Sequence, residues 1–160
     1  LWKVINLMSE YKKYFYEITK YLEDNFGINV VLSYDTDGDF WFPALKKILI
    51  NKNNQWRERY FSLIHESGHA RLDMESLSIK SLKMQKEHQE LMKTKKDFVS
   101  VINEEILAWS LGKNLSYTLM HDIDLDVYNK IKTNCIMSYI KFGLKEVYKN
   151  KINIDIIRTI

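Results

Sequence analysis

The sequence predicts a mainly helical α+β protein, in which a small antiparallel sheet packs on a helix that carries two histidines. Three observations lead to this prediction. Apolar residues recur at helical spacing in several long segments. A region rich in β-branched residues, 28–51, follows the first of these segments. The length of 160 residues suits one hydrophobic core. We therefore expect residues 1–160 to form a single domain.

The first elements are expected to be a helix and two strands. Residues 11–26 place their apolar side chains at helical spacing, and Gly27 is well placed to end that helix. The segment INVVLSY, residues 28–34, predicts a strand because it is β-branched. Residues 35–39 contain the Asp-Gly pair that is typical of a hairpin turn. The next three residues, FWF at 40–42, are expected to form the second strand.

A third strand is expected at residues 46–51, before the helix that carries the histidines. Asn53 or Asn54 would serve as the N-cap of this helix. The helix contains HESGH, residues 65–69. Gly68 in its middle costs about 1 kcal/mol relative to alanine. That cost predicts a close approach of another backbone at this position.

The second half of the chain is expected to be helical. Residues 73–97 are rich in lysine, which favours one or two solvated helices, with a docking surface for a partner as the alternative. Residues 98–115 and 124–143 carry apolar side chains at helical spacing. Cys135 lies on the apolar stripe of the last helix. We therefore interpret Cys135 as a small core residue and not as a nucleophile.

Composition limits the classes of function. The net charge of +3 is small and gives no strong signal of nucleic-acid binding. The apolar runs are far shorter than a membrane span. The single cysteine cannot form an internal disulfide, and the first residues lack the apolar region of a signal peptide. We therefore expect a cytoplasmic protein that does not bind a membrane.

His65 and His69 are the residues most indicative of function. On a helix they lie about 40° apart around the axis and about 6 Å apart along it, so both can bind one metal ion. Glu66 points about 100° away from His65, where it can reach a water molecule on that metal. That is the geometry of a general base. The alternative is two partly buried histidines beside a solvent-exposed glutamate.

A catalytic zinc ion needs a third protein ligand and an open position for water. Glu105 is the favoured candidate, because it shares an apolar helix face with Ile102 and Trp109. A carboxylate on a buried face is costly unless it is paired or binds a metal. Glu104, its neighbour, should point toward the edge of that face and is the alternative ligand.

The two remaining histidines are weaker candidates for the third ligand. His88 lies among charged residues of the lysine-rich segment, and its neighbours look exposed. His121 lies in an expected loop. We expect His121 or Tyr117 to serve instead as a hydrogen-bond donor to the transition state.

The combination of H-E-x-x-H on one helix and a glutamate on the next resembles the gluzincin group of metallopeptidases. The segments HESGHARL and EEILAW look like those of ImmA/IrrE-type metallopeptidases and of small zincin-like proteins in phage genomes. The resemblance covers roughly residues 46–115. It implies a zincin-like fold in which strand 46–51 aligns a substrate peptide. Ile106 and Leu107 depart from the Ala-Asn that often follows the family's ligand glutamate.

We therefore expect a zinc-dependent metallopeptidase, a hydrolase in which His65, His69 and Glu105 bind zinc. Glu66 would be the general base for a zinc-bound water. By resemblance, the substrate is a repressor or another regulatory protein of a mobile element, and a small peptide is equally compatible. A regulatory protein is a further candidate partner, and the sequence leaves open whether a partner switches the activity on. The alternatives are a non-catalytic zinc-binding interaction protein of zincin ancestry and a metal-free helical module that binds a partner.

Overall fold

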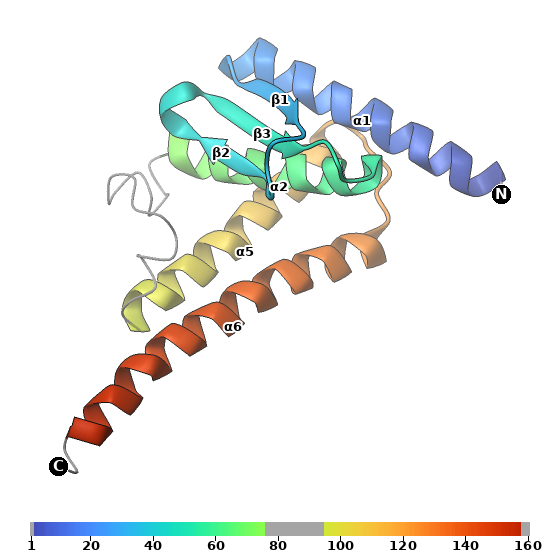
Figure 1. Cartoon of the computed structure of the whole chain (residues 1–160). Helices are drawn as coiled ribbons and strands as arrows, with labels where there is room; N and C mark the ends of the chain where they lie inside the picture. The colour runs from blue at the N-terminus through green and yellow to red at the C-terminus, as the bar shows by residue number, and fades with distance from the viewer. Residues whose placement is uncertain (1, 76–94, 158–160) are drawn as a thin grey trace.

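The computed structural model describes the backbone of residues 2–75 and 95–157, and the side chains of residues 10–75 and 98–145. The part of the lysine-rich segment at 76–94, with His88, lies outside the described residues. Figure 1 shows the elements, which follow the chain as α1 (Trp2–Phe26), β1 (Asn29–Ser33), β2 (Phe40–Phe42), a short 3₁₀ helix (Pro43–Leu45), β3 (Lys47–Asn51), α2 (Trp56–Met74), α5 (Lys95–Thr118) and α6 (Leu125–Ile157).

The sheet has three strands in the order β1-β3-β2, so the last strand in sequence is the central one. β2 pairs with β3 antiparallel, with Trp41 opposite Ile48. β1 pairs with β3 in parallel, with Val30 opposite Ile48. The α+β class is confirmed, but the prediction of an antiparallel sheet is wrong for β1. Residues 35–39 accordingly connect two strands that are not neighbours, instead of forming a hairpin turn.

Burial explains why β3 takes the central place. Ile48 and Ile50 of β3 are fully buried, whereas β2 buries Trp41 alone and β1 is buried only in part. β3, which buries two β-branched side chains, is therefore stabilised most by having a strand on each side. Lys46 makes the tight return from β2 possible, because it adopts a left-handed conformation with φ of 44°.

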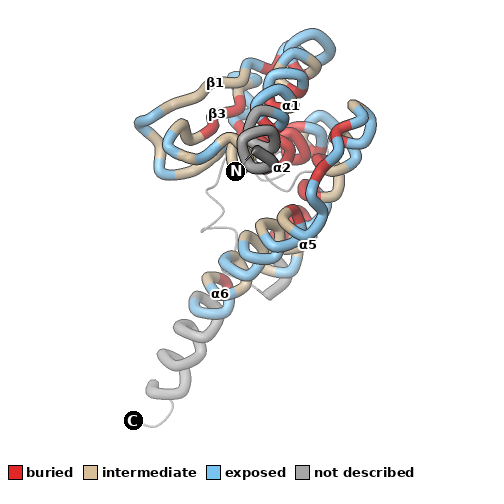
Figure 2. Tube along the Cα trace, turned by 90° about the vertical axis from the view of Figure 1, so that its right-hand side faces the viewer, coloured by how far each residue is buried: buried red, intermediate tan, exposed pale blue. Residues whose placement is uncertain are grey.

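α2 is the central helix of the fold and contacts α1, β2, β3 and α5. From Tyr60 to Ala70 almost every residue is buried, as the red section of α2 in Figure 2 shows. A helix that is buried all round belongs to the interior of a protein. The polar residues at positions 65–69 are therefore held in the core and not on the surface.

The ends of α1 and α2 test two predictions. Gly27 ends α1 as predicted, with a positive φ of 64° that glycine adopts without strain. The N-cap of α2 is Gln55, whose backbone N–H donates to the Glu58 carboxylate at 2.8 Å. The prediction of Asn53 or Asn54 is therefore wrong. The capping box depends on a residue three positions further along, which favours Gln55.

α6 is the longest helix described and runs beside α5 (Figure 1). Asp124 directly precedes α6, and its carboxylate accepts a hydrogen bond from the Val127 N–H in the first turn, at 3.0 Å. Its polar residues interrupt any long apolar stretch. In the part of the chain that the structure describes, no helix has both the length and the apolarity needed to cross a membrane.

Candidate metal centre

α2 and α5 cross with their backbones in contact at two glycines. A Cβ atom on Gly68 would overlap the backbone carbonyl group of Ala108, and one on Gly112 would overlap that of Ile64. The predicted close approach at Gly68 is therefore confirmed. Gly112 lies within α5, which continues to Thr118. Together the two glycines set how close the helices come.

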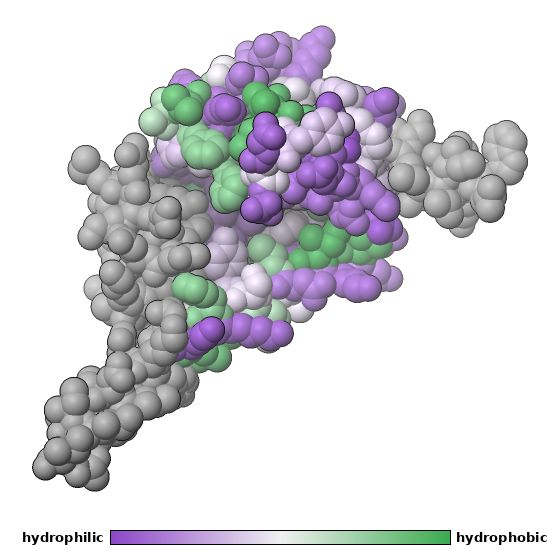
Figure 3. All heavy atoms as spheres, viewed as in Figure 1, coloured by the Kyte–Doolittle hydropathy of each residue, from purple (hydrophilic) through white to green (hydrophobic). Residues whose placement is uncertain are grey.

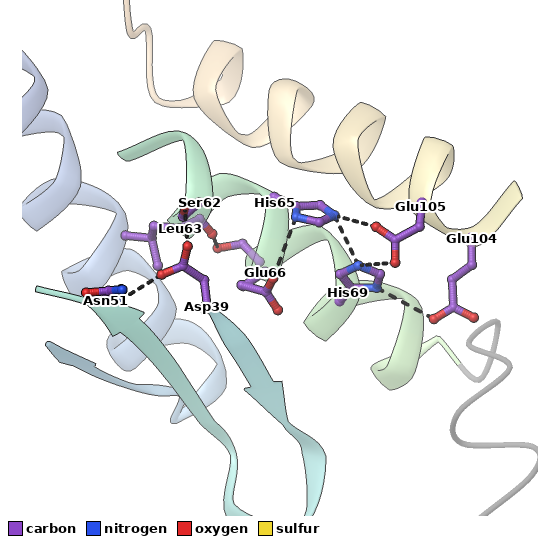
Figure 4. A network of polar contacts seen from close by, with 10 residues as sticks. Asp39, Asn51, Ser62, Leu63, His65, Glu66, His69, Glu104 and Glu105 are labelled. Carbon is purple, nitrogen blue, oxygen red and sulfur yellow. Dashed lines mark hydrogen bonds and ion pairs between the residues drawn. The ribbon is translucent and has the colours of Figure 1, made fainter. Parts of the chain in front are cut away.

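This crossing brings His65 and His69 of α2 against Glu105 of α5 (Figure 4). The Nε2 atoms of the two histidines lie 3.1 Å apart. Glu105 Oε2 lies 3.0 Å from His65 Nε2, and Glu105 Oε1 lies 3.4 Å from His69 Nε2. All three residues are buried and could hold a metal ion. Two nitrogens bound to one ion at tetrahedral angles would be about 3.3 Å apart, which fits this separation.

The outer nitrogens of both imidazoles face further carboxylates. His69 Nδ1 lies 3.6 Å from Glu104 Oε1, and His65 Nδ1 lies 3.6 Å from Glu66 Oε1. Glu104 was expected at the edge of its helix face, but it is only 4% exposed. A carboxylate beside the outer nitrogen orients an imidazole and makes it a more basic ligand. Glu104 therefore supports His69 from outside the group that could hold the metal.

The charges in this cluster are strongly coupled. Burial by itself would lower the pKa of His69, but the carboxylates of Glu104, Glu105 and Glu66 raise it to about 10. Burial would raise the pKa of Glu105, yet hydrogen bonds and charge from His65 and His69 hold it well below its usual range. Without a metal, His69 therefore carries a proton opposite the Glu105 carboxylate. A bound cation would replace that proton, because imidazole binds a metal in its neutral form.

Trp109 forms one wall of the cluster. Its indole stacks on the His65 imidazole, with ring centroids 4.4 Å apart and planes 9° apart. The backbone carbonyl of Trp109 accepts a hydrogen bond from the Tyr128 hydroxyl at 2.8 Å. Cys135 packs against the same core, and burial, followed by the charge of Glu105, raises the pKa of its thiol to about 12. These facts agree with the prediction that Cys135 is a core residue.

His121 belongs to a different cluster. Its Nδ1 lies 3.1 Å from the Tyr60 hydroxyl, its Nε2 lies 3.1 Å from Glu17 Oε2, and its ring stacks on Tyr14. Both ring nitrogens are thus engaged by residues outside the metal cluster. Tyr117 is 48% exposed on the outer side of α5. Neither residue is placed for the role of transition-state donor that the sequence suggested.

Tyr139 of α6 is a residue of this site that the sequence did not indicate. Burial, followed by the negative charge of Glu105, raises the pKa of its hydroxyl. Helical spacing placed Tyr139 correctly on the inner stripe of its helix. The spacing carries no information about which polar group the hydroxyl meets, because that depends on how α6 packs against α5.

Comparisons of this chain with models of known protein families, with curated proteins and with solved structures give no match. The resemblance of HESGHARL and EEILAW to metallopeptidase segments is therefore carried by those residues alone. The case for a function rests on the same residues and on their arrangement around one point.

Proposed function

We propose that this protein is a zinc-dependent metallopeptidase with a gluzincin-type site. The observation that carries the proposal is the convergence of His65, His69 and Glu105 on one buried point, with the Glu66 carboxylate 3.6 Å from the outer nitrogen of His65. Two imidazoles and one carboxylate form the ligand set of catalytic zinc in several peptidases, and they leave a coordination position open. A structural zinc site would instead be expected to close with a fourth protein ligand.

Glu66 supports catalysis over structural binding. It is only 7% exposed, and it lies next to His65 without being one of the residues that converge on the metal point. A buried carboxylate is costly, so its presence needs a reason. When bound, a zinc ion activates water and polarises a peptide carbonyl. Glu66 would accept the proton of the attacking water and return it to the amine that leaves.

The sheet changes the expected path of the substrate. The resemblance implied that strand 46–51 aligns a peptide, but β3 is the central strand and pairs with β1 along its length. An added peptide strand therefore belongs at an outer edge. We propose the edge of β2, which contacts α2 and exposes Phe40 and Phe42. Figure 3 shows hydrophobic side chains gathered over this part of the sheet, among hydrophilic ones.

The test compares the wild-type chain with Glu66→Gln. Both proteins should purify with about one zinc ion per chain, measured by elemental analysis. Protein N-termini produced by cleavage should then appear in cells that express the wild type and not in cells that express Glu66→Gln. Glu75→Gln is the matched control, because Glu75 is exposed at the end of the same helix. It should behave as the wild type.

The other outcomes identify the alternatives. A wild-type protein that binds zinc but yields no cleavage products would be a non-catalytic zinc-binding protein. A wild-type protein that binds no metal would overturn the site, and a metal-free helical module would then be the better description. Cleavage that persists in Glu66→Gln would show that another residue is the base.

A further inference from the structure

Asp39 directly precedes β2 and joins three parts of the fold. Its Oδ1 atom accepts a hydrogen bond from the backbone N–H of Asn51, the last residue of β3, at 2.7 Å. Its Oδ2 atom accepts a hydrogen bond from the hydroxyl of Ser62 in α2, at 2.6 Å. Figure 4 shows the Asp39 carboxylate between the end of β3 and α2. One carboxylate thus links the start of β2 both to the neighbouring strand and to the helix of the metal centre.

The hydroxyl of Ser62 departs from the common behaviour of a serine within a helix. Such a hydroxyl often donates to the backbone carbonyl four residues earlier. Ser67 of α2 and Ser110 of α5 do so, at 2.6 and 2.9 Å. Ser62 donates instead to a carboxylate 23 residues away in the sequence. A hydrogen bond to a carboxylate is stronger than one to a neutral carbonyl, so the link between α2 and Asp39 is a favourable one.

This link reaches α2 at the level of the proposed general base. Ser62 lies four residues before Glu66, so the two side chains project from the same side of the helix, about 6 Å apart along its axis. β2 is an outer strand of the sheet, and its free edge is the one that we propose for the substrate peptide. The distance between this edge and Glu66 therefore depends on where Asp39 holds the start of β2.

Among the described residues, few other contacts fix the distance between β2 and α2. The strand has three residues, all paired with β3, and of these only Trp41 is buried. Pairing with β3 sets the position of β2 within the plane of the sheet. Its distance from α2 depends on the packing of Trp41 and on the hydrogen bond from Ser62. Apolar packing has little directional preference, whereas a short hydrogen bond defines both a distance and an angle.

We infer that Asp39 is a positioning residue for the substrate: through Ser62 it sets the distance between the peptide-binding edge of β2 and the metal centre with Glu66. This inference rests on the proposed function. A peptide on that edge reacts only when its carbonyl group lies within reach of the attacking water, and a misplacement of about 1 Å can lower the rate about 100-fold. Asp39 acts through the backbone of β2 and not by contact with the reacting atoms.

The experiment compares Ser62→Ala and Asp39→Ala with Asp39→Asn. Ser62→Ala removes the link to α2 and leaves the hydrogen bond from Asn51, whereas Asp39→Ala removes both. Asp39→Asn can keep both, because its amide oxygen accepts from the Asn51 N–H and its amide NH₂ donates to the Ser62 hydroxyl. Ser110→Ala is the matched control, since Ser110 is also partly buried and its hydroxyl donates within its own helix.

The first measurement is hydrogen exchange of residues 39–42, followed by mass spectrometry, and it needs no substrate. The loss of one hydrogen bond typically changes a local opening equilibrium by about tenfold. We therefore expect this segment to exchange about tenfold faster in Ser62→Ala, and at least as fast in Asp39→Ala. Asp39→Asn and Ser110→Ala should match the wild type. Zinc affinity, measured by competition with a chelator, should be the same in all these variants.

The second measurement is the cleavage rate of a peptide that the wild type cleaves, chosen from a library of peptides made by digesting a whole proteome. We expect Ser62→Ala to lower kcat about tenfold or more and to change KM little, because the edge keeps its backbone groups but holds the peptide in the wrong place. Asp39→Asn should keep most of the wild-type kcat. A merely structural role would lower the melting temperature and leave the kcat of the folded protein unchanged.

The inference is overturned by a Ser62→Ala protein that has either the wild-type exchange at residues 39–42 or the wild-type kcat. An Asp39→Asn protein that behaves like Asp39→Ala overturns it too. Each of these results leaves the proposed function standing. A wild-type protein that binds zinc but cleaves no peptide of the library overturns the proposed function, and the role of Asp39 with it.

Discussion

The imidazole of His65 lies flat against the indole of Trp109, with 9° between the two ring planes. Because Trp109 is only 2% exposed and its backbone carbonyl is held by Tyr128, its indole is a fixed surface. The stacking therefore sets the plane of the imidazole. In that plane, His65 Nε2 points at Glu105, 3.0 Å away.

Replacing Trp109 by leucine should loosen the metal site as well as the core. Removing a buried indole costs roughly 2–4 kcal/mol of unfolding free energy, because a cavity remains. We also expect zinc affinity to fall, since the His65 ring is no longer held in one plane. Trp41→Leu is the control, because Trp41 is a buried tryptophan of β2. It should lower the melting temperature and leave zinc affinity unchanged. Equal zinc affinity in both variants would contradict the role given to Trp109.

Gly68→Ala should destabilise the protein, although alanine is the better helix former. The gain in helix propensity is about 1 kcal/mol. Against this, the new Cβ overlaps the backbone of Ala108, which cannot rotate aside as a side chain would. Overpacking typically costs about 1–3 kcal/mol, and a backbone obstacle belongs at the upper end. We expect a net loss of about 1–2 kcal/mol in urea unfolding, with weaker zinc binding.

The exposed Asn114 of α5 provides the control for this substitution. Asn114→Ala changes helix propensity in the same direction at an exposed position. It should be neutral or slightly stabilising. If Gly68→Ala also proved stabilising, the two helices would have to be able to separate at no cost.

Zinc affinity should rise with pH between 6 and 9. The reason is His69, whose pKa is raised to about 10 in the metal-free protein, so the residue is protonated throughout this range. Zinc binding must expel that proton, and each unit of higher pH makes this easier by about tenfold. The measurement is chelator competition at several pH values, with proton release followed in a weakly buffered solution. Affinity that stays constant from pH 7 to 9 would mean that His69 is already neutral.

Glu105→Gln should weaken zinc binding more than Glu104→Gln. Glu105 is fully buried and faces both Nε2 atoms, whereas Glu104 lies beside the outer nitrogen of His69. We expect the first change to remove most of the affinity, because a charged ligand becomes neutral. The second should cost about 10- to 100-fold, as is usual for a residue that supports a ligand. The reverse order would assign the metal to Glu104.

Much of the site could be predicted because its signals are local. The spacing of His65 and His69 fixes their common direction on any helix. The cost of burying a carboxylate pointed to Glu105, and the cost of a glycine within a helix pointed to the close approach at Gly68. Each of these arguments concerns one helix and needs no knowledge of the neighbours.

What could not be predicted depends on how elements pack together. The Asp-Gly pair at residues 37–38 favours a turn, but it does not determine which strands pair, and β3 is placed between β1 and β2. His121 and Tyr139 stand on correctly predicted segments. The Nε2 atom of His121, however, meets Glu17 of a helix distant in sequence, and the pKa of Tyr139 is raised by burial and by the charge of Glu105 on another helix. Helical phase identifies the inner face of a helix and leaves the partners on that face undetermined.

The two glycines at the helix crossing also define what a diverged relative of this chain must keep. At Gly68 and Gly112 the backbones of α2 and α5 are in direct contact. Substitutions among the surrounding apolar side chains can therefore leave the distance between these two helices unchanged. We therefore expect relatives to share a glycine directly before the second histidine and another glycine seven positions after the ligand glutamate. The histidines, the ligand glutamate and the two glycines together form a sequence pattern that fewer unrelated proteins match than H-E-x-x-H alone. A chain could have the two histidines and the ligand glutamate but bulky residues at both glycine positions. Such a chain would contain the motif, but the helices equivalent to α2 and α5 could not come close enough for the three residues to meet.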